Sequence, residues 1–157
     1  MDIHFTGLPT DDILAVKAAN RDAYGLTPER HLSDGGAYPC RHCLGETPHG
    51  EDYLILAHRP FRGLNAYTET GPIFLCAQDC AAYTPSARVP DILVSARYLL
   101  RGYTADERIL YGTGQIVETA LLADAARALL HDDRIAFADI RSAANNCFQC
   151  RVVRASG

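Results

Sequence analysis

Lysine is almost absent from this 157-residue chain: Lys17 is the only lysine among fifteen basic residues, and the rest are arginine. Genomic composition bias, which also accounts for the many alanines, is the favoured explanation. The alternative is that some arginines serve bidentate anion recognition, which lysine performs less well. Nineteen acidic residues leave a net charge of −4. Because a phosphate backbone is bound by a concentrated positive surface, this balance argues against nucleic acid as a partner.

Long apolar runs are also lacking. No stretch approaches the about 20 apolar residues that span a bilayer, so we expect no membrane segment. Residues 1–4 have neither the basic start nor the apolar stretch of a secretory signal. We therefore expect a cytoplasmic location, where the reducing environment disfavours structural disulfides.

The common catalytic and nucleotide-binding motifs are missing. Residues 112–114 read Gly-Thr-Gly, but they lack the full GxGxxG pattern and the GK[ST] ending of a phosphate-binding loop. GxSxG, HExxH and EF-hand patterns are absent as well. The sequence therefore leaves open whether the chain is an enzyme.

What is present predicts one α+β domain over residues 1–157. The apolar fraction of 48% and charged fraction of 22% are ordinary for a globular protein. Predicted strands follow one another through turns, which favours a mostly antiparallel sheet with two main helices packed on it. The strands are expected at 2–8, 53–57, 72–77, 92–103, 108–111, 135–140 and 148–153, and the helices at 10–24, with Thr10 as its cap, and 118–130. Residues 25–39 are predicted to form a loop.

All six cysteines come in close pairs. Cys40 and Cys43 form one CxxC pair, Cys147 and Cys150 form another, and a CxxxC pair lies between them. A CxxC turn can direct both sulfur atoms at one ion, and two such pairs complete the tetrahedral shell that zinc prefers. We predict a zinc-type site formed by Cys40, Cys43, Cys147 and Cys150. The alternative ligands are Cys76, Cys80 and His42.

Two other interpretations of the cysteines stay open. Free cysteine is among the most buried residue types, so some of these thiols are explained as small apolar core groups. A redox or disulfide role is the second, but a thioredoxin-like CxxC opens a helix, and here Gly45 and Pro48 follow instead.

Short motifs in a fixed order resemble the domain-of-unknown-function 1203 family. They cover nearly the whole chain: Tyr38-Pro39-Cys40-Arg41 with Leu44, Gly50-Glu51 before Leu54-Ile55-Leu56, Gly71-Pro72-Ile73-Phe74, Arg101-Gly102-Tyr103, and the run from Asn146 to Val152. The resemblance implies a small bacterial stand-alone domain with no established activity.

Two functional hypotheses follow. The first is a binding or structural module in which the thiolate site ties the N-terminal loop to the last strand. The second is a small enzyme that uses Cys40 or a thiolate-bound metal on a small anionic molecule held by Arg41 and Arg101, with Arg151 as a further anion-binding candidate. His42, His49 and His58 lie near the first cysteine pair and are candidate ligands or bases.

Overall fold

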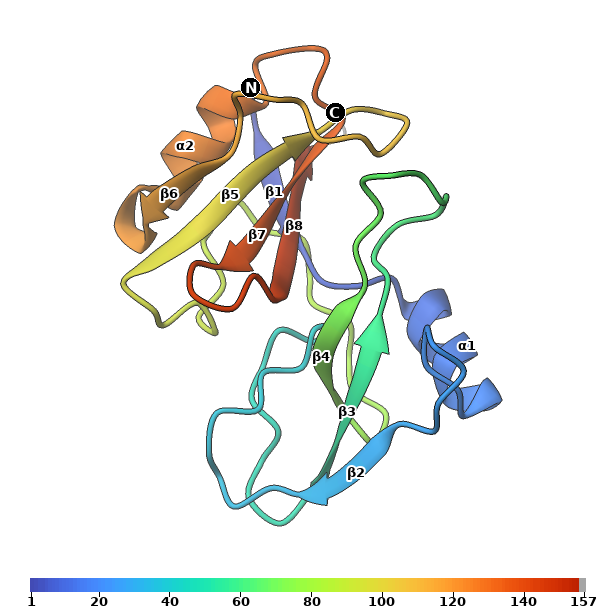
Figure 1. Ribbon diagram of the computed structural model, residues 1–157. Helices are drawn as coiled ribbons and strands as arrows, with labels where there is room; N and C mark the ends of the chain where they lie inside the picture. The colour runs from blue at the N-terminus through green and yellow to red at the C-terminus, as the bar shows by residue number, and fades with distance from the viewer. Residues whose placement is uncertain (156–157) are drawn as a thin grey trace. The chain divides into compact units, whose positions relative to one another are not determined.

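A computed structural model of the chain (Figure 1) describes residues 1–155. The predicted α+β class is confirmed: these residues form two antiparallel sheets, two α-helices and one turn of 3-10 helix. The elements are β1 (Ile3–Thr6), α1 (Thr10–Ala19), β2 (Glu29–Leu32), β3 (Asp52–His58), β4 (Gly71–Cys76), β5 (Arg97–Tyr103), β6 (Gln115–Glu118), η1 (Thr119–Leu121), α2 (Leu122–Leu129), β7 (Phe137–Ser142) and β8 (Phe148–Arg154).

The chain divides into two compact units. Unit 1 contains residues 1–6, 61–68 and 84–157, and unit 2 contains residues 7–60 and 69–83. Both are assembled from separate stretches of chain, so neither corresponds to a continuous half of the sequence. The prediction of a single domain stays a prediction.

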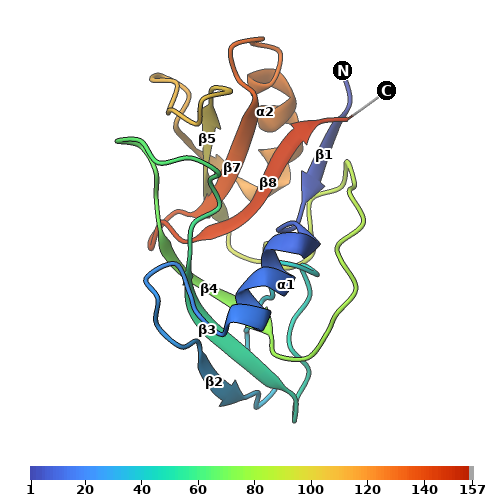
Figure 2. The ribbon, with the colours of Figure 1, turned by 90° about the vertical axis from the view of Figure 1, so that its right-hand side faces the viewer.

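Unit 1 is a five-stranded sheet in the order β1-β8-β7-β5-β6. Alternate residues of these strands form one continuous buried row, as the period of two in a strand requires. The helix α2 contacts β5 and β6 and lies on one face of the sheet, behind β7 and β8 in Figure 2. The core on this face consists of buried side chains from the strands and the helix: Ile3, Phe5, Tyr98, Leu100, Val117, Leu122, Ala126, Leu130, Ala138, Ile140, Cys150 and Val152.

The residues of β7 and β8 that point to the other face of the sheet include a buried ion pair between Asp139 and Arg151. Asp139 is fully buried, and its two carboxylate oxygens accept hydrogen bonds of 2.7 and 3.1 Å from the Arg151 guanidinium. The two residues face each other in the ladder between the strands. The same guanidinium lies over the Phe137 ring, 3.6 Å from its centroid. This bidentate, partly desolvated pair is a fixed structural element of unit 1.

Unit 2 is built on a three-stranded sheet in the order β2-β3-β4. β3 and β4 are the apolar strands that the sequence predicts, and Tyr53, Leu54, Leu56, Ile73 and Leu75 are buried there. The helix α1 belongs to the same unit, and its one fully inward side chain is Ile13, at 2% exposure.

The end of α1 differs from its predicted position. The helix ends at Ala19, not near residue 24, because Asn20 adopts a left-handed conformation (φ 49°) and its N–H bonds to the Lys17 carbonyl oxygen. Thr10 is not a capping residue: Pro9 precedes the helix, and the Thr10 hydroxyl contacts His42 instead.

Two strands lie where the sequence predicts other structure. β2 lies inside the predicted 25–39 loop. All four of its residues are exposed, so the sequence has no apolar pattern there that would predict a strand. β6 ends at Glu118, the first residue of the predicted 118–130 helix, and α2 itself begins at Leu122 after the turn of 3-10 helix. Residues 92–96 are not a strand, and the predicted 108–111 strand is reduced to a single bridge between Tyr103 and Ile109.

Neither helix within residues 1–155 has the length and apolar character needed to cross a membrane.

Candidate metal centre

The first cysteine pair lies on a tight turn of unit 2. The Cys40 N–H donates to the Gly45 carbonyl oxygen at 2.9 Å, and the Leu44 N–H donates back to the Cys40 carbonyl oxygen at 2.9 Å. Leu44 is in the left-handed region (φ 50°), which is unusual for a bulky residue and bends the chain sharply after Cys43. The turn therefore presents both sulfur atoms from one short loop, as expected for a CxxC pair.

Strand β4 places the second pair beside this turn. Cys40 forms a parallel bridge with Phe74, and the Arg41 N–H donates to the Phe74 carbonyl oxygen at 3.0 Å. Cys76 ends the strand two residues after Phe74, and Cys80 follows in the next loop. That loop returns to the turn, because the Tyr83 N–H donates to the His42 carbonyl oxygen at 3.1 Å.

Four sulfur atoms meet as a result. Those of Cys40, Cys43, Cys76 and Cys80 all lie within 4.8 Å of one another, and those of Cys40 and Cys80 are 3.9 Å apart. In a tetrahedral zinc site with Zn–S bonds near 2.3 Å, sulfur atoms are separated by about 3.8 Å. The cluster thus has the donor atoms and nearly the spacing of a four-thiolate metal site. All four cysteines are free thiols.

The clustered thiols shift one another's pKa. Hydrogen bonds from Cys43 and then Cys76 lower the pKa of Cys40. The hydrogen bond with Cys40 raises the pKa of Cys43 to about 12. Hydrogen bonds to Cys40 and Cys43 also raise the pKa of Cys76, and burial raises the pKa of Cys80 to about 12. Only one negative charge is thus favoured in the cluster, and a divalent cation would have to displace the remaining protons.

His42 links the cluster to helix α1. Its ring is buried at 4% exposure, with Nδ1 3.2 Å from the Cys80 sulfur and Nε2 2.9 Å from the Thr10 hydroxyl oxygen. When Cys80 is a thiolate it only accepts, so Nδ1–H must donate to sulfur and Nε2 must accept from the hydroxyl. Such outer hydrogen bonds orient a metal ligand and stabilise its charge.

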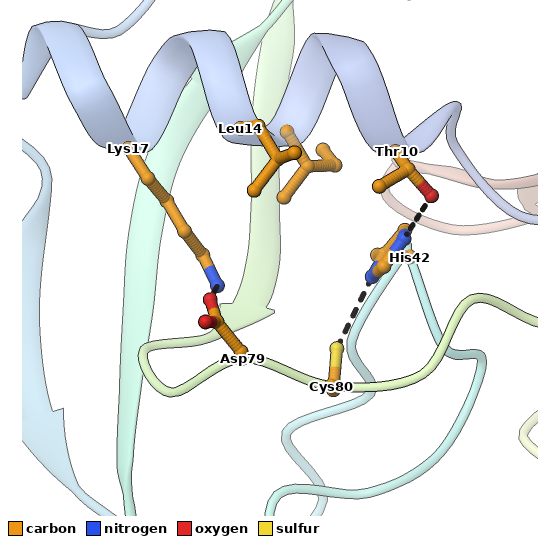
Figure 3. Close-up of a pocket in the computed structure, with 7 residues that line it drawn as sticks. Thr10, Leu14, Lys17, His42, Asp79 and Cys80 are labelled. Carbon is orange, nitrogen blue, oxygen red and sulfur yellow. Dashed lines mark hydrogen bonds and ion pairs between the residues drawn. The ribbon is translucent and has the colours of Figure 1, made fainter.

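A pocket of about 200 Å³ opens beside this end of the cluster (Figure 3). Ile13 and Leu14 of α1 form its apolar wall, and His42 and Cys80 lie opposite the helix. At the far end of the pocket, the Lys17 ammonium donates to the Gln78 carbonyl oxygen at 2.9 Å and lies 3.9 Å from Asp79. Lys17 therefore fastens the loop that carries Cys80 to α1.

The composition of the cluster differs from the set that sequence spacing favours. Cys76 and Cys80, given as alternative ligands, complete the group with Cys40 and Cys43. Cys147 and Cys150 belong to unit 1 and are not members of it. Cys150 is fully buried opposite Ile140 in the β7–β8 ladder. A role for Cys147 and Cys150 as ligands stays a prediction.

The candidate anion-binding arginines are distributed over both units. Arg41, in unit 2, is buried, donates to the Pro39 carbonyl oxygen at 2.6 Å and lies 6.0 Å from the Phe74 ring centroid. In unit 1, Arg101 Nε donates to the Tyr103 hydroxyl at 2.9 Å, and Arg151 binds Asp139. An anion-binding role for these three residues stays a prediction.

Sequence reasoning missed the contribution of α1. Thr10 and Lys17 contact the cluster's histidine and its second loop, and no spacing signal relates them to the cysteines. Of the other histidine candidates, His58 is buried on β3 and His49 is exposed, and neither belongs to the four-residue cluster.

The fold and the site define the class of this protein: it is an α+β protein with a four-thiol cluster that could hold a metal ion. The model of the family "Protein of unknown function (DUF1203)" matches residues 37–154, and the chain belongs to this family. The matched range includes all four clustered cysteines and begins after α1. No curated protein and no solved structure matches the chain.

Proposed function

We propose that this protein is a binding or structural module whose unit 2 is stabilised by one zinc-type ion held by Cys40, Cys43, Cys76 and Cys80. The single observation that supports it is the convergence of four sulfur atoms within 4.8 Å. Sulfur-only tetrahedral sets select zinc or iron among the common metals. Carboxylates and waters, which magnesium and calcium require, are not part of the cluster.

The local structure supports a structural role over a catalytic one. Catalytic zinc keeps one position open, whereas four thiolates close the shell. The proposed ion would join the turn at residues 39–46 to the end of β4 and its following loop. Neither segment is a helix, and each is held by a few backbone hydrogen bonds and single side-chain contacts. Binding of structural zinc contributes an apparent ~10–16 kcal/mol in small zinc-dependent domains, which is enough to determine whether such a unit folds.

The test is metal analysis of full-length protein purified without chelator under reducing conditions. We expect close to one zinc per chain. In denaturant-free buffer at most two thiols should react, with Cys147 reacting before the buried Cys150. Chelator treatment should release the metal, expose four more thiols to the reagent and lower the melting temperature. Less than about a tenth of a zinc or iron per chain, with thiol reactivity unaffected by chelator, would refute the proposal.

A further inference from the structure

Cys80 is placed differently from the other members of the cluster. Cys40 is held against β4, Cys43 is part of the same turn, and Cys76 ends the strand, whereas Cys80 lies in the loop that follows. The pocket beside α1 is lined by Cys80 and by no other member of the cluster. A molecule that enters this pocket therefore meets one sulfur atom of the four, that of Cys80.

The surroundings of Cys80 suit a thiolate that reacts in place. His42 Nδ1, 3.2 Å from the sulfur, is held by Thr10 on its other side, so the sulfur has a fixed polar neighbour. The pocket wall is apolar at Ile13 and Leu14, and its two charged side chains, Lys17 and Asp79, form an ion pair with each other, so the lining favours a small neutral reactant over a charged one. The Cys40 sulfur lies 3.9 Å from that of Cys80.

We infer that Cys80 is an oxidative modification site, at which the metal-bound Cys80 thiolate attacks a hydroperoxide that enters the α1 pocket, and Cys40 then forms a disulfide with Cys80. This inference rests on the proposed function, since it concerns the metal-loaded state. Hydrogen peroxide is the simplest member of the reactant class: it is neutral and far smaller than the approximately 200 Å³ pocket.

The reaction balances in two steps. The Cys80 thiolate attacks one peroxide oxygen, the O–O bond breaks, and a sulfenic acid and hydroxide are formed. The Cys40 thiolate then attacks the Cys80 sulfur, an S–S bond forms, the S–O bond breaks, and a second hydroxide leaves. The two sulfurs lose two electrons in total, peroxide gains them, and two protons from the buffer convert both hydroxide ions to water. The metal loses two of its four thiolates and is released.

Geometry favours this disulfide. An S–S bond is near 2.05 Å, so the Cys40 and Cys80 sulfurs must approach by about 2 Å from their separation of 3.9 Å. Cys40 is fixed by its bridge to β4, whereas Cys80 lies in an irregular loop, and the movement therefore falls mainly on the loop.

The test uses full-length zinc-loaded protein treated with hydrogen peroxide, with zinc release followed by a chromogenic chelator. A sulfenic-acid trap and peptide mapping by mass spectrometry identify the oxidised cysteines. We expect the trap to label Cys80 first, a Cys40–Cys80 disulfide to form with one zinc released per chain, and dithiothreitol to restore zinc binding.

A variant that leaves every ligand in place tests the pocket. Leu14→Trp fills it from an exposed helical position, and Leu32→Trp, on the exposed strand β2 and outside the pocket lining, is the matched control. Leu14→Trp should slow zinc release by roughly fivefold or more, because access controls thiolate oxidation, and Leu32→Trp should not.

The outcomes separate the two ideas. Protein that binds no metal refutes the proposed function and this inference with it. Protein that binds zinc, but is oxidised first at another cysteine or releases zinc equally fast in both tryptophan variants, refutes only the inference.

Discussion

Replacing Cys76 with serine, and separately Cys150 with serine, distinguishes the ligand set that the structure brings together from the one that spacing favours. Both side chains are buried at the protein interior, with exposed fractions of 6% and 0%. Only Cys76 belongs to the four-thiol cluster. The two substitutions are therefore matched in chemistry and burial and differ in their relation to the proposed ion.

The expected magnitude follows from the number of ligands. If ~10–16 kcal/mol of apparent zinc binding is divided over four thiolates, one thiolate contributes about 2.5–4 kcal/mol. At 1.4 kcal/mol per factor of ten, Cys76→Ser should weaken zinc binding by roughly 60- to 700-fold. Cys150→Ser should leave zinc affinity within about threefold, because Cys150 is not a member of the cluster. It buries a hydroxyl in the α2 core, so its cost should appear in the melting temperature instead.

The assay is competition for zinc against a chromophoric chelator of known affinity, with circular dichroism to show that each variant is folded. Equal loss of zinc affinity in the two variants would refute the reasoning and favour a site that includes the CxxC pair of unit 1. Full affinity in Cys76→Ser would show that the four-thiol cluster does not bind the ion.

Three further predictions concern pH, the buried ion pair and a close backbone contact. The pKa values of Cys43 and Cys80 are raised to about 12 and that of Cys76 is raised as well, so three thiols carry protons at neutral pH and zinc must displace them. The apparent zinc dissociation constant should therefore rise by about 1,000-fold per unit fall in pH, measured by competition titration, and a pH-independent constant would contradict this. Asp139→Ala leaves its arginine partner without a counter-ion and should lower the free energy of unfolding by about 3–5 kcal/mol in urea titrations; a loss below about 1 kcal/mol would contradict the desolvated-pair interpretation. A Cβ at Gly7 would lie 2.3 Å from a backbone carbonyl oxygen of the cysteine turn, so Gly7→Ala should destabilise the protein by about 1–3 kcal/mol, whereas Gly71→Ala, with open space around it, should change stability by less than about 0.5 kcal/mol.

Local patterns account for the elements that the sequence predicts correctly. The apolar runs at residues 53–57 and 72–77 became the buried strands β3 and β4, and the helical pattern before residue 130 became α2. β2 was missed because it is an exposed strand held by backbone pairing with β3, and backbone pairing leaves no mark in side-chain polarity. β6 was missed for a related reason: only Val117 of its four residues is buried.

The sequence by itself determined that the cysteines occur in close pairs and that the sulfur atoms of Cys40 and Cys43 lie near each other, since that geometry depends on one short turn. The tertiary structure decided which second cysteine pair lies beside Cys40 and Cys43. The parallel bridge between Cys40 and Phe74 brings the end of β4, and with it Cys76 and Cys80, to the turn. The spacing of residues along a chain carries information about contacts within a turn, but a contact between remote segments depends on how strands pair, and that pairing is fixed by the packing of the whole unit.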